Sequence, residues 1–185
     1  MLIDDYLSVY QFSEYHSIVV RNRAEQIFPV IKNTNFRKSK FLSFLFVVRG
    51  LPAKMNSIDG FVDSGFILLE EHENKEIVLG FLFGVTLRKI KVVLPNEFKK
   101  FTDPRYIKGV WNFRLSRKDN KTILSTETRV FCPTKKSKIL FSIYWFFISY
   151  FSGLIRMIIL KLIKHESELT THTAQIRTVR LRREK

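Results

Sequence analysis

The sequence predicts an α+β fold in which a curved antiparallel sheet wraps around a long C-terminal helix, with two short helices after the first strand. Three observations predict it. An alternating, β-branched stretch occupies residues 15–21, hairpin patterns occupy residues 65–83 and 109–131, and the longest apolar helical stretch, residues 135–168, comes last. Helices gathered on one side of antiparallel strands are typical of this class.

Two helices are expected after the first strand. Asn22 stands three residues before Glu25, which resembles a capping box, and apolar residues follow at helical spacing as far as residues 33–35. A second helix is predicted over residues 39–49, with Gly50 as its left-handed terminating residue. Residues 51–60 are expected to form a loop.

The first hairpin pairs residues 65–70 with residues 76–83 around a turn at 72–75. Residues 87–94 alternate basic with apolar side chains and predict a further strand. A polar break follows at residues 95–104, with a short helix expected around residues 97–101.

The second hairpin has its turn at residues 118–121. Alternation puts Trp111 and Phe113 on one face of its first strand. In the partner strand, Glu127 and Arg129 share the face opposite Thr128.

Composition restricts the classes of protein that the chain can belong to. The 185 residues suit one domain, and 45% hydrophobic residues exclude a disordered polycation. Lys and Arg number 32 against 17 Asp and Glu, giving a net charge of +15. Basic stretches alternate with acidic ones, which favours basic faces on one fold, able to contact an anionic membrane. Nucleic acid is not an expected partner, because no recognition motif accompanies the charge.

Catalytic and cofactor motifs are not found. Cys132 is the single cysteine, so no internal disulfide is possible, and we expect an idle thiol. The four histidines have no metal-ligand spacing, and residues 80–84 lack the spacing of a phosphate-binding loop. The sequence therefore predicts no metal and no cofactor. The acidic start is unlike a signal peptide, so a cytoplasmic location is expected.

The last helix is the main ambiguity. Residues 139–155 carry no charge, but a membrane span needs about 20 apolar residues. Arg156 would cost about 2.5–3.5 kcal/mol near the centre of a span. Ser142, Ser149, Gly153 and Arg156 form a narrow stripe, typical of a helix pressed on a sheet with one edge in water. We expect a buried helix and a protein that dissolves without detergent; an interfacial helix and a true span are the alternatives.

Four short stretches resemble a bacterial branch of the START-like helix-grip superfamily, the SRPBCC-type group that holds polyketide cyclases and lipid-transport domains. They are residues 111–114, 125–130, 144–145 and 152–156. The opening strand and the helix after it, residues 15–28, are also similar to the usual start of that superfamily.

The resemblance covers residues 13–168 and implies one helix-grip domain there. Residues 1–12 would be an N-terminal extension, and residues 169–185 a basic, flexible tail. A sheet that grips a helix leaves a cavity between them, and an apolar cavity is the default binding site.

Seven residues are candidates for lining this cavity. The aromatic candidates could equally be core residues, and Glu127 with Arg129 could equally be ion pairs on the solvent face. If they face the cavity, they would form a polar end close to Arg156, because buried charges must pair. The candidates are Trp111, Phe113, Glu127, Arg129, Tyr144, Trp145 and Arg156.

These observations predict binding or transport of a hydrophobic or amphipathic small molecule, such as a lipid, an isoprenoid or a polyketide-like compound. One alternative is a cyclase- or hydratase-type enzyme using the same cavity, with Glu127 as the base. Another is a peripheral membrane adaptor that uses the basic faces and the aromatic last helix.

Overall fold

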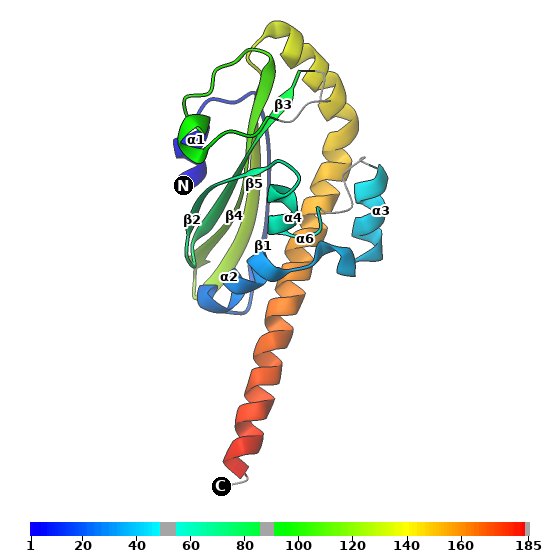
Figure 1. Cartoon of the computed structure of the whole chain (residues 1–185). Helices are drawn as coiled ribbons and strands as arrows, with labels where there is room; N and C mark the ends of the chain where they lie inside the picture. Colours follow the sequence, from blue (N-terminus) through cyan, green and yellow to red (C-terminus); the bar gives the residue numbers. More distant parts are fainter. Residues whose placement is uncertain (49–54, 86–90, 184–185) are drawn as a thin grey trace.

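The computed structural model describes residues 1–48, 55–85 and 91–183. It contains a curved five-stranded antiparallel sheet in the order β1-β5-β4-β3-β2, with α6 packed across it (Figure 1). The α+β fold predicted from the sequence is therefore confirmed. The strands are β1 (Phe12–Val20), β2 (Ile67–His72), β3 (Glu76–Gly84), β4 (Tyr106–Lys118) and β5 (Lys121–Phe131).

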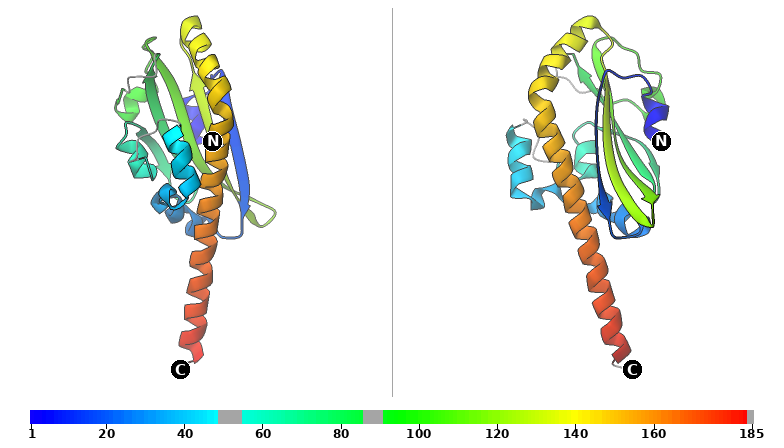
Figure 2. Two further views of the ribbon diagram at one scale, coloured as in Figure 1. Left: turned by 90° about the vertical axis from the view of Figure 1, so that its right-hand side faces the viewer. Right: turned by 180° about the vertical axis from the view of Figure 1, so that it is seen from behind.

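Helices cover both faces of this sheet. The face under α6 also carries α2, α3 and α4, whereas α1 and α5 pack on the other face (Figures 1 and 2). We call these the α6 face and the α1 face. The helices are α1 (Leu2–Tyr6), α2 (Ala24–Asn33), α3 (Lys40–Val48), α4 (Ile58–Val62), α5 (Pro95–Phe98) and α6 (Lys135–Arg183), with a 3-10 turn at Phe36–Lys38.

Strand alternation builds a separate apolar core on each face. On β4, Trp111 and Phe113 point to the α6 face and join its larger core. Val110 points the other way and packs with Ile3 and Phe98 under the two helices of the α1 face. Strands β3, β4 and β5 are thus mostly buried on both sides, so a polar side chain on either of their faces needs a partner.

Burial along α6 is uneven. In its middle portion Ile159, Leu160 and Ile163 are buried against β1 and α2. Towards its N-terminus most apolar side chains are exposed, and Phe141 is the buried exception among residues 139–151. The helix is also longer than expected, because it continues past residue 168 to Arg183.

The predicted cap of α2 is wrong by one residue. The cap is Arg23, whose backbone N–H donates to the side chain of Gln26 at 3.4 Å. Asn22 instead donates its side-chain amide to the carbonyl of Ser167 on α6 at 2.6 Å. A tertiary hydrogen bond has replaced the local one that the sequence suggested.

Two further local predictions need correction. The expected loop before β2 contains the start of α4, which is capped where Ser57 Oγ accepts a hydrogen bond from the Gly60 N–H at 3.1 Å. Residues 91–94 of the expected strand 87–94 are not in a strand, and its other residues, 87–90, lie outside the described residues. The expected terminating residue Gly50 also lies outside them.

Gly109 leaves room for an aromatic ring on the α6 face. A Cβ atom at this position would lie 2.0 Å from the Phe81 ring. We expect Gly109→Ala to lower the free energy of unfolding by about 1–3 kcal/mol, because the added methyl displaces that ring. Urea unfolding measures the change. Phe81→Leu should relieve the clash, so the double variant should lose less stability than the sum of the single losses; simple additivity would contradict the explanation.

Candidate functional site

The aromatic candidates on β4 are part of the larger core. Trp111 contacts Phe61 and Phe113 with ring centroids 5.0 and 4.9 Å apart. Its indole N–H donates to Thr126 Oγ1 at 2.7 Å, which satisfies the buried polar atom. Trp111 and Phe113 therefore belong to the core between the sheet and the helices of the α6 face.

The aromatic candidates on α6 are only partly buried. Trp145 stacks on Phe141 at 5.7 Å and lies 6.0 Å from Phe12 at the start of β1. Tyr144 also packs against Phe141, with centroids 5.6 Å apart. Phe83, which the sequence analysis did not single out, is likewise partly buried on the same face.

These partly buried rings gather at one end of the sheet. Strand register pairs Phe12 with Val130 and Val130 with Gly109, and Gly109 lies opposite Phe81 on β3. Phe83 is two residues further along β3, and α6 begins shortly after β5 ends at this same end. The α6 face thus has a closed end, under the middle of α6, and a less covered aromatic end.

A polar cluster joins α6 to the sheet edge. Arg156 Nη1 lies 2.7 Å from Glu14 Oε2, and Nη2 donates to Thr128 Oγ1 at 2.7 Å. Arg156 also donates to the hydroxyl of Ser152 one turn earlier. On the same strand as Glu14, His16 Nε2 lies 2.9 Å from Glu14 Oε1. The carboxylate is therefore shared between a guanidinium and an imidazole.

Gly153 permits this close approach. A Cβ atom there would lie 2.5 Å from Glu14 Oε1 and 3.2 Å from His16 Nε2. Gly153 and Arg156 of the predicted stripe therefore face β1. Of the predicted stripe, Arg156 is buried and Ser142 is exposed, so the expectation of an edge in water is wrong for Arg156.

Glu127 and Arg129 lie on the α1 face and do not meet Arg156. The interpretation that puts the three in one cavity is therefore wrong, because strand alternation turns these two side chains away from Thr128. They are not solvent-face pairs either, since both are buried.

The N-terminal helix covers this second cluster. Arg129 Nε donates to Glu127 Oε1 at 2.6 Å, and Nη1 donates to Asp4 Oδ1 at 2.7 Å and to the Leu7 carbonyl at 3.2 Å. Burial acts to lower the pKa of Arg129, but the hydrogen bonds to Glu127 and Asp4 outweigh it and raise that pKa. The same hydrogen bond from Arg129 lowers the pKa of Asp4. This cluster holds α1 on the sheet.

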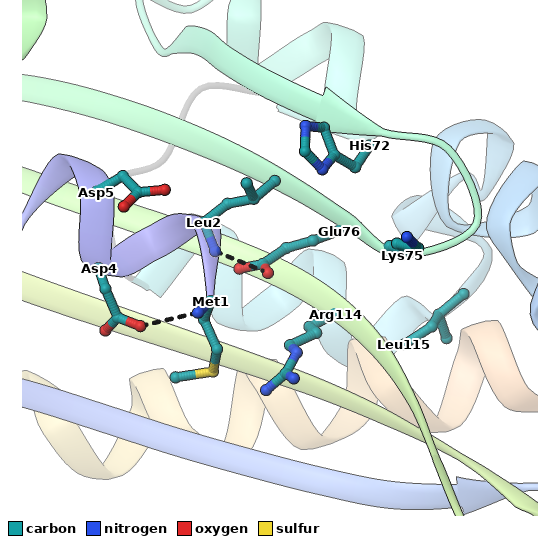
Figure 3. Close-up of a pocket in the computed structure, with 9 residues that line it drawn as sticks. All are labelled: Met1, Leu2, Asp4, Asp5, His72, Lys75, Glu76, Arg114 and Leu115. Atoms are coloured by element: carbon teal, nitrogen blue, oxygen red, sulfur yellow. Dashed lines mark hydrogen bonds and ion pairs between the residues drawn. The ribbon is translucent and has the colours of Figure 1, made fainter.

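A pocket of about 560 Å³ opens beside α1 (Figure 3). Its wall contains cationic side chains, Lys75 and Arg114, together with carboxylates, among them Glu76. Glu76 accepts hydrogen bonds from the Leu2 N–H at 3.1 Å and from the Asn112 side chain at 2.7 Å. The Glu76 carboxylate therefore binds the backbone of α1. We attribute the pocket to the way this helix packs on the sheet and not to a ligand.

Within residues 1–48, 55–85 and 91–183, no three His, Cys, Asp or Glu side chains are grouped so that they could hold a metal ion. Cys132 is buried, and burial raises the pKa of its thiol to about 11. The thiol is therefore protonated at neutral pH and is a poor nucleophile.

No family model matches the chain, and no curated protein matches it. Solved structures do match. TTHA0849 from Thermus thermophilus is 6% identical, with 86% of this chain and 99% of that chain covered and a TM-score of 0.38. CalU16 from Micromonospora echinospora is 10% identical, covering 86% and 88%, with a TM-score of 0.31. The Zhui aromatase/cyclase from Streptomyces sp. R1128 is 13% identical, covering 85% and 93%, with a TM-score of 0.30.

The assignment of fold therefore rests on the chain's own topology. An antiparallel sheet that holds a long C-terminal helix, with short helices after its first strand, is the helix-grip arrangement.

Removing Arg156 tests the polar cluster. Arg156→Met should lower the free energy of unfolding by roughly 3 kcal/mol, because the Glu14 carboxylate, whose side chain is 15% exposed, would lose its guanidinium partner. Denaturant unfolding measures the loss. The double variant Arg156→Met with Glu14→Gln should recover most of it, and equal stability of the single and double variants would contradict the ion pair's role.

The thiol of Cys132 should resist alkylation in the folded protein. Iodoacetamide at pH 8 should label it at least about tenfold more slowly than in urea, because burial and the raised pKa both suppress the thiolate. Mass spectrometry follows the labelling. Equal rates in the folded and unfolded chain would show that the thiol is accessible.

Proposed function

We propose that the protein binds or carries a hydrophobic or amphipathic small molecule, such as a lipid, an isoprenoid or a polyketide-like compound. The molecule would lie between the α6 face and the first half of α6. One observation carries this proposal: the aromatic side chains at this end are partly buried, whereas Ile159, Leu160 and Ile163 further along α6 are buried.

The chemistry of the two walls supports an apolar ligand. Phe12 and Phe83 on the sheet and Tyr144 and Trp145 on the helix keep surface that a ligand would cover. Each Å² of apolar surface removed from water contributes about 25 cal/mol. The two helix residues also have polar ring atoms, which suits the boundary between an apolar ligand and water.

The cluster around Arg156 supports an amphipathic ligand. It lies on α6 beyond Tyr144 and Trp145, towards the closed end, and combines a guanidinium, a carboxylate and an imidazole. The side chain of His16 is 26% exposed, so it can offer a hydrogen bond to the polar group of a bound molecule. The cluster would thus orient the ligand.

A cyclase or hydratase activity is a second candidate, with different residues. Glu127 cannot be the base on the α6 face, because it points to the α1 face and is held by Arg129. Glu14 and His16 are instead in hydrogen-bond contact on the helix side of the sheet, as a proton-transferring pair needs. Saturable binding with no chemical change of the ligand would separate carriage from catalysis.

Native mass spectrometry of the full chain tests the proposed function. We expect a discrete excess mass that is lost on denaturation and recovered in an organic extract. Trp145→Ala should reduce the occupied fraction by about tenfold, because it removes part of one wall.

Glu127→Gln is the matched control, since it weakens a buried cluster on the far face. It should lower the melting temperature and leave the occupied fraction unchanged. A bare mass, together with no saturable binding of oleate to the extracted protein, would contradict the proposal. An equal loss of ligand in the control would place the site elsewhere.

A further inference from the structure

The first half of α6 presents a large apolar surface to solvent. The exposed fractions of Phe146, Phe147 and Tyr150 are 78%, 66% and 77%. We call this surface the outer stripe; its members are Ile139, Leu140, Ile143, Phe146, Phe147, Tyr150 and Phe151. Large apolar residues exposed together are unusual on a soluble monomer and mark an interaction site.

A second helix next to α6 also exposes aromatic side chains. In Figure 1 and in the right-hand view of Figure 2, α3 lies beside α6 on the side away from the sheet. Its Phe41 and Phe44 are 52% and 59% exposed. Their buried neighbours Leu42 and Leu45 hold the helix in the core, so the two rings belong to the outer face of a packed element.

The charge around the outer stripe is entirely positive. Lys135, Lys136 and Lys138 are exposed immediately before it, and Lys161 is exposed after it. Between Lys135 and His165 the sequence contains no acidic residue. Aromatic and aliphatic side chains flanked by lysines are typical of helices that lie in the surface of an anionic membrane.

We propose that the outer stripe and the exposed rings of α3 dock on the surface of an anionic lipid bilayer, with α6 lying in the plane of the interface. This goes beyond the proposed function, because it requires no bound ligand. A second copy of the chain is a poorer occupant, because two such surfaces would bring their lysines together.

A membrane span is also a poorer explanation. Among the described residues, one helical segment, Lys135–Leu169, is long and apolar enough to cross a membrane. However, 39% of its most apolar stretch is buried in the protein, and Arg156 in its middle is paired with Glu14 on β1. To span a membrane, this helix would have to leave the core and lose the contact between Arg156 and Glu14. A helix that lies on the interface keeps its described contacts.

Vesicle flotation with the full chain tests the docking surface. We expect binding to phosphatidylcholine vesicles that contain phosphatidylserine, with much weaker binding to phosphatidylcholine alone and at high salt. The triple variant Phe146→Ser, Phe147→Ser and Tyr150→Ser should weaken binding about tenfold or more. Its melting temperature should stay close to the parent value, because these side chains are exposed.

Two control variants separate the stripe from general surface properties. Val9, Val92 and Leu94 are exposed by 68%, 64% and 62% elsewhere, and their triple serine variant should bind vesicles like the parent. Replacing Lys135, Lys136 and Lys138 with Gln should remove most of the salt dependence. The matched change at Lys100, Lys118 and Lys121, which are exposed elsewhere, should have a smaller effect.

Four outcomes would overturn the proposal. They are no flotation with anionic vesicles, flotation unaffected by the stripe variant, membrane association that resists both high salt and carbonate, and a vesicle-free dimer that the stripe variant dissociates while the parent binds no vesicles. The third would indicate a span and the fourth a second copy.

Discussion

The ion pair between Arg156 and Glu14 fixes how α6 is rotated on the sheet. Residues of a helix are rigidly related, with 3.6 per turn, so turning Ser152, Gly153 and Arg156 towards β1 decides where every other side chain points. Phe147 then lies half a turn away, in solvent. The buried middle of α6 and its exposed apolar first half thus follow from the same constraint.

On both faces of the sheet, a buried guanidinium is paired with a carboxylate. Among the described residues, each face has an apolar core and one buried guanidinium, Arg156 on the α6 face and Arg129 on the α1 face. Each guanidinium has a carboxylate partner, because an unpaired buried charge is too costly. On the α1 face, Asp4 brings α1 over the cluster, which makes the N-terminal residues part of the folded domain.

Local patterns were enough to predict the five strands of the sheet, the hairpin turns and most helices, because alternation and helical spacing are properties of neighbouring residues. The same alternation wrongly predicted a strand at residues 91–94. Alternation also put Glu127 on the face opposite Thr128, and the structure agrees. What local patterns could not supply was the partner of each charge. Glu14 and Arg156 are 142 residues apart, and no spacing in the sequence links them. The sequence also did not predict that α1 covers Glu127. A helix as short as α1 has too few residues to show a clear period.

The orientation of α6 has a consequence for its apolar side chains. Turning the helix by half a turn would bury Phe147, but it would also bring Ile159 and Ile163 out of the core and separate Arg156 from Glu14. A buried ion pair generally adds little stability compared with packed apolar side chains. The rotation observed is therefore the one that buries the apolar side chains in the middle of α6, and it leaves Phe146, Phe147 and Tyr150 outside. In the docking proposed above, an anionic bilayer would offer these rings an apolar environment and would attract the lysines beside them.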